Sequence, residues 1–174
     1  MFTAVSSFPA DIPPTLSDLI STSDTMYAAM SSTAPAYRFG FLRNVTLEGI
    51  EPYLRYHMLR MGLRPELIFG GYGSIRQDLI LPDSPLVKGC PDLLVTAFML
   101  EELDPHYGLP GWNASHCREE LSTIFDALAA SDASTISLNT FIVPFRSETG
   151  TLIAAPDIAS EVIRLNDFVR TFVR

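Results

Sequence analysis

The stretch from Arg38 to Tyr72 constrains the fold most, because it carries signals for a strand, a turn, a helix and a second strand. A short apolar run, Phe39–Leu42, precedes the polar turn Arg43–Thr46, and a helical period then continues until Gly62. The segment Arg64–Phe69 reads as the second strand. Two parallel strands joined in this way place the first turn at the carboxyl end of the sheet, where α/β proteins bind ligands.

The helix between these strands has apolar residues at a spacing near 3.6, and a glycine follows it as a stop signal. The pattern predicts that one face of this helix is buried. That face should consist of Ile50, Tyr53, Leu54, Met58 and Met61.

The rest of the chain continues the alternation of strands and helices. The apolar run Pro91–Met99 predicts a strand buried on both faces, and Thr135–Phe141 predicts a fourth strand. A helix is expected over His116–Ala130, and a final helix should begin with Asp157 as its cap. The sequence therefore predicts an α/β fold with a parallel sheet in the order 2-1-3-4 and helices on both faces.

Residues 1–35 differ in composition, being rich in Ser, Thr, Pro and Ala. They contain one amphipathic pattern between Leu16 and Met30, which Thr15 or Ser17 is placed to cap. We expect residues 1–35 to add one helix to the outside of a domain formed by residues 36–174. Because the alternation calls for another strand after the last helix, we expect either that the sheet exposes a face to a partner or that residues 36–174 are the amino-terminal part of a longer protein.

Charge and composition exclude several classes of function. The net charge of −8 and a pI near 4.7 argue against a nucleic-acid partner. No apolar run reaches the roughly 20 residues of a membrane span, and the first residues lack the basic region of a secretory signal. A cytoplasmic location is therefore expected. Cys90 and Cys117 are expected to be reduced thiols, and no cofactor is predicted.

The carboxyl ends of the predicted strands should bring a set of polar and glycine residues to one edge of the sheet. Their hydroxyls, amides and backbone N–H groups suit an acyl or sugar oxygen. The GGYG segment can be a turn that needs positive φ or an amide-lined oxyanion site. The predicted cleft comprises Asn44, Thr46, Gly71, Tyr72, Gly73, Ser74, Gln77, Glu101 and Asn139.

This set lacks a base beside a nucleophile. His57 falls within the first predicted helix and is expected to be partly buried. His106 and His116 flank the loop Pro105–Trp112, and their spacing is not that of a helical metal site. No metal site is predicted.

Several motifs resemble the amino-terminal domain of FkbH-like proteins, the HAD-superfamily subfamily IIIC group that handles glyceryl units in natural-product and polysaccharide biosynthesis. They are FLRNVTLEGIEPYLR, GGYGSIRQD, PDLLV and IASEVIRLNDFVR, which follow one another between Arg38 and Arg174. The resemblance implies an SGNH-hydrolase-like, flavodoxin-like three-layer sandwich. It also implies a following HAD-type domain or subunit that carries the phosphate chemistry.

The SGNH pattern is incomplete in this chain. The resemblance places Asn44 where the family has its serine nucleophile, keeps Thr46, and aligns Gly71–Gly73 with the glycine block. An amide cannot be deprotonated to attack an ester, and the block that supplies the histidine base is missing. The first interpretation is therefore a non-catalytic binding or docking domain, whose partner is a carrier protein such as an acyl carrier protein, a substrate or a second subunit. Two alternatives stay open, a divergent esterase or acyltransferase that uses Thr46 or Ser74, and an assembly-line scaffold protein.

A sheet that ends at its fourth strand would leave an edge unpaired. We also expect apolar surface under the final helix at Phe168, Val169 and Phe172. A homo-oligomer, or a following strand in a longer protein, is expected to cover this side.

Overall fold

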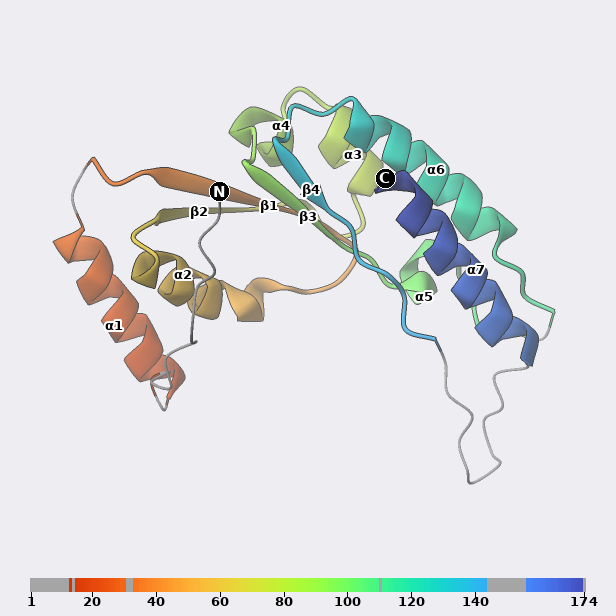
Figure 1. The fold of residues 1–174 in the computed structure, drawn as a ribbon, viewed down its shortest axis with the longest axis horizontal. Coiled ribbons are helices and arrows are strands. Elements are labelled where there is room, and N and C mark those ends of the chain that lie inside the picture. Colours follow the sequence, from red (N-terminus) through yellow and green to blue (C-terminus); the bar gives the residue numbers. More distant parts are fainter. Residues whose placement is uncertain (1–12, 14, 31–32, 110, 144–155, 174) are drawn as a thin grey trace. The chain divides into compact units, whose positions relative to one another are not determined.

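The computed structural model describes residues 13, 15–30, 33–109, 111–143 and 156–173. The fold is α/β, with a four-stranded parallel sheet flanked by helices as in flavodoxin-like proteins (Figure 1). The strand order is β2-β1-β3-β4, which confirms the predicted order. The strands are β1 (Ala36–Arg43), β2 (Arg64–Phe69), β3 (Leu93–Ala97) and β4 (Thr135–Ser137).

Strand β3 lies inside the sheet, as predicted, but only one of its faces is fully buried. Leu94 and Thr96 are buried, whereas Leu93, Val95 and Ala97 are partly buried. Leu93 pairs with Phe39 of β1 on one side and with Thr135 of β4 on the other.

Strand β4 is shorter than expected, since it ends at Ser137 instead of Phe141. Beyond Ser137, the Asn139 side chain takes the place of the strand backbone. It hydrogen-bonds the backbone N–H and carbonyl of Phe98, the residue that follows β3.

The helices α1, α2, α6 and α7 begin and end close to the expected residues, whereas the short helices α3, α4 and α5 were not predicted. Helix α7 begins at Pro156, so the expected cap Asp157 lies inside its first turn. Among the described helices, none is long and apolar enough to cross a membrane. The helices are α1 (Leu16–Ala29), η1 (Glu48–Ile50, a 3₁₀ turn), α2 (Glu51–Arg60), α3 (Ile75–Ile80), α4 (Pro85–Gly89), α5 (Leu100–Leu103), α6 (Ser115–Ala129) and α7 (Pro156–Phe172).

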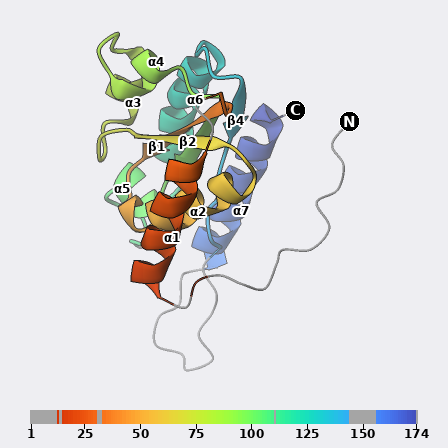
Figure 2. The same cartoon turned by 90° about the vertical axis from the view of Figure 1, so that its left-hand side faces the viewer.

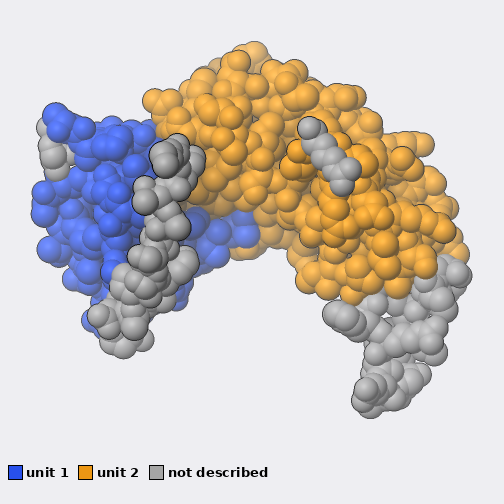
Figure 3. Space-filling view, in the orientation of Figure 1, with its two compact units in different colours: residues 1–37, 47–66 blue, residues 38–46, 67–174 orange. Residues whose placement is uncertain are grey.

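The chain forms two compact units (Figure 3). Unit 1 consists of residues 1–37 and 47–66, and unit 2 consists of residues 38–46 and 67–174. In unit 1, α1 lies alongside α2 (Figures 1 and 2). The Arg55 guanidinium joins them, since it lies 3.2 Å from the Asp24 carboxylate and stacks over the Tyr27 ring.

Helix α1 begins as predicted, because Thr15 is its N-cap. The Thr15 hydroxyl oxygen accepts the Asp18 N–H at 3.1 Å, and the hydroxyl donates to the Asp18 carboxylate at 2.6 Å. Such a cap satisfies one of the N–H groups that the first turn leaves without a helical partner. Ser17, the alternative cap, lies within the helix.

The buried face of α2 differs from the prediction. Tyr56, Met58 and Leu59 are buried, whereas Ile50, Tyr53 and Met61 are exposed. Ile50 belongs to the 3₁₀ turn η1, whose period of three residues breaks the expected phase. Met61 is the last residue before Gly62, where a φ of 78° turns the chain away from the helix. The predicted stop at Gly62 is therefore correct, but the predicted face was too long.

Helices α6 and α7 pack on each other in unit 2 and run side by side in Figure 1. The Phe125 ring stacks on Phe168 and Phe172, with centroids 5.8 and 4.6 Å apart, and the Arg118 guanidinium lies over Phe168. Val169 is buried. The expectation of bare apolar surface at these α7 residues is wrong, because α6 covers them. Strand β4 nevertheless remains at the edge of the sheet.

Candidate functional site

Three asparagine side chains hold the carboxyl end of the sheet in unit 2. In each, the amide oxygen accepts the backbone N–H of one residue, and the amide nitrogen donates to the carbonyl of that same residue. We call these pairs the asparagine clamps. They are Asn44 on Met99 (2.8 and 3.1 Å), Asn139 on Phe98 (3.0 and 2.9 Å) and Asn166 on Phe141 (2.7 and 2.9 Å).

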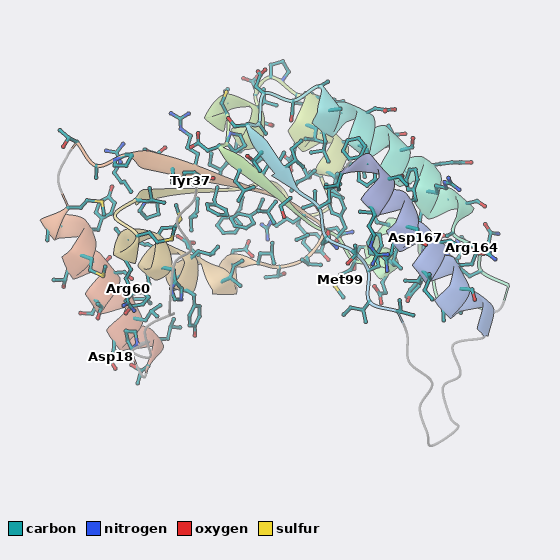
Figure 4. All side chains as sticks on the ribbon, in the orientation of Figure 1. Asp18, Tyr37, Arg60, Met99, Arg164 and Asp167 are labelled. Atoms are coloured by element: carbon teal, nitrogen blue, oxygen red, sulfur yellow. The ribbon has the colours of Figure 1, made fainter. Side chains whose placement is uncertain are left out.

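The first clamp involves the residue at the predicted nucleophile position. Asn44 directly follows β1, is only 3% exposed, and donates its own backbone N–H to Ala97 at 3.2 Å. Its side chain fixes the turn between β3 and α5, because its amide nitrogen and oxygen bind the backbone carbonyl and N–H of Met99. Met99 is labelled in Figure 4. The Asn44 amide therefore has partners within the protein and braces the turn that carries Met99.

The second and third clamps extend this bracing to β4 and α7. The Asn139 amide oxygen also accepts the Thr96 hydroxyl, whose oxygen in turn accepts the Asn139 backbone N–H. Asn166 reaches Phe141 from α7. The sequence placed Asn139 at a strand end but gave no role to Asn166. The sequence does contain a signal for Asn166, since this amide stands next to Leu165 among the apolar positions of an amphipathic helix. The structure buries it, and a buried amide needs hydrogen-bond partners.

A pocket of about 200 Å³ lies beside the clamps. Its walls are mainly apolar, and Glu101 and Tyr107 contribute a carboxylate and a phenol. Burial is the main cause that raises the pKa of Tyr107, and the nearby Glu101 carboxylate and Cys117 raise it further. The phenol therefore keeps its proton and can donate a hydrogen bond. We call this the rim pocket; it is lined by Phe98, Met99, Leu100, Glu101, Tyr107, Asn139, Thr140, Phe141 and Ile142. Of the predicted cleft it includes only Glu101 and Asn139.

The glycine turn after β2 forms a separate region of unit 2. Gly73 has a φ of 66°, in agreement with the prediction that this turn needs positive φ. Three backbone N–H groups of this turn already bind carbonyl groups within the protein. Gly70 donates to Phe41 at 2.9 Å, Gly73 to Arg43 at 3.3 Å, and Ser74 to Gly71 at 3.4 Å. These three amides would have to give up a partner before they could bind an oxyanion.

Arg43 anchors this turn and was not singled out from the sequence. Its Nε donates to the Gly70 carbonyl at 3.0 Å and its Nη1 to the Val45 carbonyl at 3.2 Å. The guanidinium also lies over the Phe69 ring, 5.6 Å from its centroid. In the sequence, Arg43 directly follows the apolar run Phe39–Leu42. An arginine at this place can be expected to anchor a neighbouring turn, because a guanidinium that is buried there requires hydrogen-bond partners.

Asp78 is the second residue that the sequence analysis missed. Its carboxylate is buried on α3, and Oδ2 has no hydrogen-bond partner of normal geometry among the described residues. Burial raises the pKa of Asp78 above its ordinary value, although the Gly71 N–H and the Arg43 guanidinium oppose this shift. A Cβ on residue 71 would lie 2.8 Å from the Ser74 hydroxyl and 3.8 Å from Asp78 Oδ2. The two side chains therefore share the space beside Gly71.

The remaining predicted cleft residues lie on the surface of unit 2. Thr46, Tyr72 and Gln77 are exposed, and the Ser74 hydroxyl contacts the Tyr72 carbonyl at 3.5 Å. In the part of the chain that the structure describes, no histidine forms a hydrogen bond with Thr46 or Ser74. Neither hydroxyl is therefore paired with a base in this conformation.

The histidines have other surroundings. His57 is partly buried on α2, as expected, with its ring against Tyr56. His106 lies in the loop after α5, where its Nδ1 is 3.2 Å from the buried Asp104 carboxylate, which also accepts the Trp112 indole N–H at 2.9 Å. Burial alone would raise the pKa of Asp104, but these donors, the His106 N–H and the neighbouring His116 hold it below its ordinary value. Across the described residues, no three His, Cys, Asp or Glu side chains form a group that could hold a metal ion.

Comparisons with known proteins show the fold of this chain. Neither the protein-family models nor the curated proteins gave a match. Among solved structures, the chain is similar to the N-terminal part of protein BF1531 from Bacteroides fragilis, a crystal structure described as containing a phosphatase domain complexed with Mg. The TM-score is 0.66 and the identity is 13%, and the match covers 90% of this chain but 42% of that one. The present chain therefore spans less than half of its structural neighbour.

Proposed function

We propose that this chain is a non-catalytic, SGNH-like docking module that binds a HAD-type domain in an FkbH-like protein of natural-product or polysaccharide biosynthesis. The fold is similar to that of part of its structural neighbour, the N-terminal part of protein BF1531, which is described as containing a phosphatase domain. The motifs between Arg38 and Arg174 point to the same family of proteins.

The observation that carries the proposal is the Asn44 clamp. The resemblance places Asn44 where an SGNH hydrolase has its serine, and Asn44 is buried with both amide atoms bound to Met99. A nucleophile must reach its substrate and lose a proton to a base, and a clamped amide can do neither. Asn44 instead braces the turn after β3. This role suits a protein surface that must keep its shape in order to bind a partner.

Charge favours one of two expected partners, the HAD-type domain and the acyl carrier protein, over the other. Acyl carrier proteins are acidic, and this chain has a net charge of −8, so that like charges would slow their encounter. We therefore expect the HAD-type domain to be the main partner. Carrier binding, if it occurs, should weaken further at low salt, where repulsion is least screened.

The test has two parts. First, the coding sequence downstream of Arg174 and its neighbouring genes are read for a HAD-type aspartate motif. The domain found there is then purified and mixed with the present chain in size-exclusion chromatography with light scattering, with an acyl carrier protein as the comparison. A complex with the HAD-type domain supports the proposal. A complex with the carrier protein alone, or with neither, contradicts it.

The divergent esterase is tested separately, by hydrolysis of p-nitrophenyl acetate. The unmodified chain is expected to match the rate of a heat-denatured sample. Hydrolysis above this background that Thr46→Ala or Ser74→Ala abolishes would replace the docking proposal with the esterase.

A further inference from the structure

The three asparagine clamps all hold residues that line the rim pocket. These residues are Phe98, Met99 and Phe141. Each is held through its own backbone N–H and carbonyl, and the clamps reach them from the end of β1, from the segment after β4 and from α7. A site whose walls are already fixed loses less conformational entropy when it binds. The rim pocket is therefore preorganised for binding.

The mouth of the rim pocket is open to a ligand and offers both apolar and acidic groups. Met99, labelled in Figure 4, is 50% exposed, and Ile142 is 83% exposed. The Glu101 side chain is exposed too, and within the described part of the chain its carboxylate has no hydrogen bond or ion pair. Tyr107 lies close enough to interact with the charge of this carboxylate. Because no Lys, Arg or His is among the described lining residues, the pocket favours a cation with an apolar stem.

The volume of the rim pocket, about 200 Å³, is below the roughly 300–1,000 Å³ of sites for drug-sized molecules. It corresponds to roughly seven water molecules at about 30 Å³ each, and hence to about seven non-hydrogen atoms. An arginine side chain has this size. It also combines apolar methylenes with a planar cation that pairs with carboxylates and stacks on aromatic rings, and arginine is enriched among the anchor residues of protein interfaces. Size and lining therefore fit one arginine side chain of a protein partner.

We infer that the rim pocket is the anchor site of the docking surface and takes an arginine side chain of the HAD-type domain, with its guanidinium at Glu101 and its methylenes along Met99 and Ile142. This inference rests on the proposed docking function and names the surface that performs it. The Tyr107 phenol oxygen can accept a further guanidinium N–H. The net charge of −8 favours a partner whose docking surface is basic.

The first experiment tests the pocket without the partner, by NMR titration of the full chain with n-propylguanidinium chloride. This probe has the same non-hydrogen atoms as an arginine side chain, and n-propylurea is its uncharged equivalent. Methyl resonances of Met99 and Ile142 are expected to shift and to saturate toward about 100 mM, because so small a ligand binds weakly. An exposed ion pair contributes little, so n-propylurea should bind about two- to fivefold more weakly than n-propylguanidinium.

Two variants of neighbouring carboxylates give the matched comparison for this titration. Glu101→Gln should weaken binding of n-propylguanidinium by the same two- to fivefold, roughly. Glu102→Gln should leave it unchanged, because Glu102 is also exposed on α5 but does not line the pocket. Thermal melts confirm that both variants fold.

The second experiment measures the affinity of the chain for the HAD-type domain. Glu101→Lys places a like charge against the arginine and should weaken the complex at least about tenfold. Glu102→Lys changes the net charge equally and should alter the affinity by less than about threefold. Ile142→Ser should also weaken the complex, whereas Ile163→Ser should not, because Ile163 is exposed on α7 but does not line the pocket.

The outcomes separate this inference from the docking proposal. Absence of saturating shifts at Met99 and Ile142, or full binding of the probe by Glu101→Gln, would overturn the inference even if the complex forms. A complex that is equally tight with Glu101→Lys and Glu102→Lys would also overturn it and would leave the docking proposal intact. If the unmodified chain forms no complex, the docking proposal fails and the HAD-type domain is not the source of the arginine, whatever the probe does.

Discussion

At the scale of single residues, Asn44 shows how one side chain can replace a stretch of backbone pairing. Its amide supplies one donor and one acceptor to Met99, as a neighbouring strand would. Strand β1 and the turn after β3 are thus joined at a position where the ladder has ended. Residue 44 therefore has a structural role that its alignment with a nucleophile position did not suggest.

Replacing Asn44 by alanine should lower the free energy of unfolding by about 2–4 kcal/mol, because two hydrogen bonds are lost and the Met99 backbone groups are left without partners. Asn44→Asp should also destabilise, since a carboxylate accepts from the Met99 N–H but repels its carbonyl. Urea unfolding measures both. The control Thr46→Ala changes an exposed neighbour and should stay within about 0.5 kcal/mol. A neutral Asn44→Ala would show that the clamp does not stabilise the fold.

Gly70 is the second residue whose identity follows from its contacts. A methyl group there would meet Asp78 Oδ2 at 2.5 Å and the Phe41 carbonyl at 3.0 Å. We expect Gly70→Ala to destabilise by about 1–3 kcal/mol. Gly49→Ala is the matched control, because no atom lies within 4 Å of its Cβ position. The double variant Gly70→Ala with Asp78→Ala should recover part of the loss. Thermal melts that rank Gly49→Ala as the more harmful change would refute this account.

At the scale of elements, the short helices α3 and α5 each position a buried carboxylate, and the two respond to pH in opposite directions. The pKa of Asp78, on α3, is raised by burial, so between its ordinary value of 3.8 and its folded value the folded chain binds more protons than the unfolded chain. Stability from this group therefore falls as pH rises through that window. The pKa of Asp104, after α5, is lowered by its donors, so its contribution is present above 3.8 and is lost as pH falls.

The prediction is a crossed pair of pH profiles. Urea midpoints of Asp78→Asn and Asp104→Asn are compared with the unmodified chain from about pH 3 to pH 7. Asp78→Asn should gain stability relative to the unmodified chain as pH rises, whereas Asp104→Asn should lose it. Parallel profiles for the two variants would show that the environments of these carboxylates are not as described.

At the scale of the whole molecule, the covering of α7 by α6 changes the expected assembly. Phe168 and Phe172, which were expected to need a partner, pack on Phe125 of α6, and Arg118 of α6 lies over Phe168. On this side of the sheet, what remains for association is the edge strand β4, which is only three residues long. Short edge strands are one means by which proteins avoid pairing with other chains.

We therefore expect the 174-residue chain to be a monomer at micromolar concentration. Light scattering over a dilution series measures this. A dimer that dissociates on dilution, and that Thr135→Lys abolishes, would instead support pairing through the exposed edge of β4. A dimer that Thr135→Lys leaves intact would place the contact elsewhere.

The sequence by itself determined the four strands and their order and the four longer helices, but not the short helices α3, α4 and α5. Apolar period and turn residues predicted β2 to the residue, the stop at Gly62 and the order of the parallel strands, and they narrowed the first cap to Thr15 or Ser17. These features depend on local backbone preferences and on the handedness of crossovers. Only the tertiary structure decided which polar groups meet. The partners of Asn44, Asn139 and Asn166 lie 25 to 55 residues away, and the burial of Asp78 depends on Gly70 coming close to α3. Such contacts depend on how the elements pack, and no local period in the sequence records them.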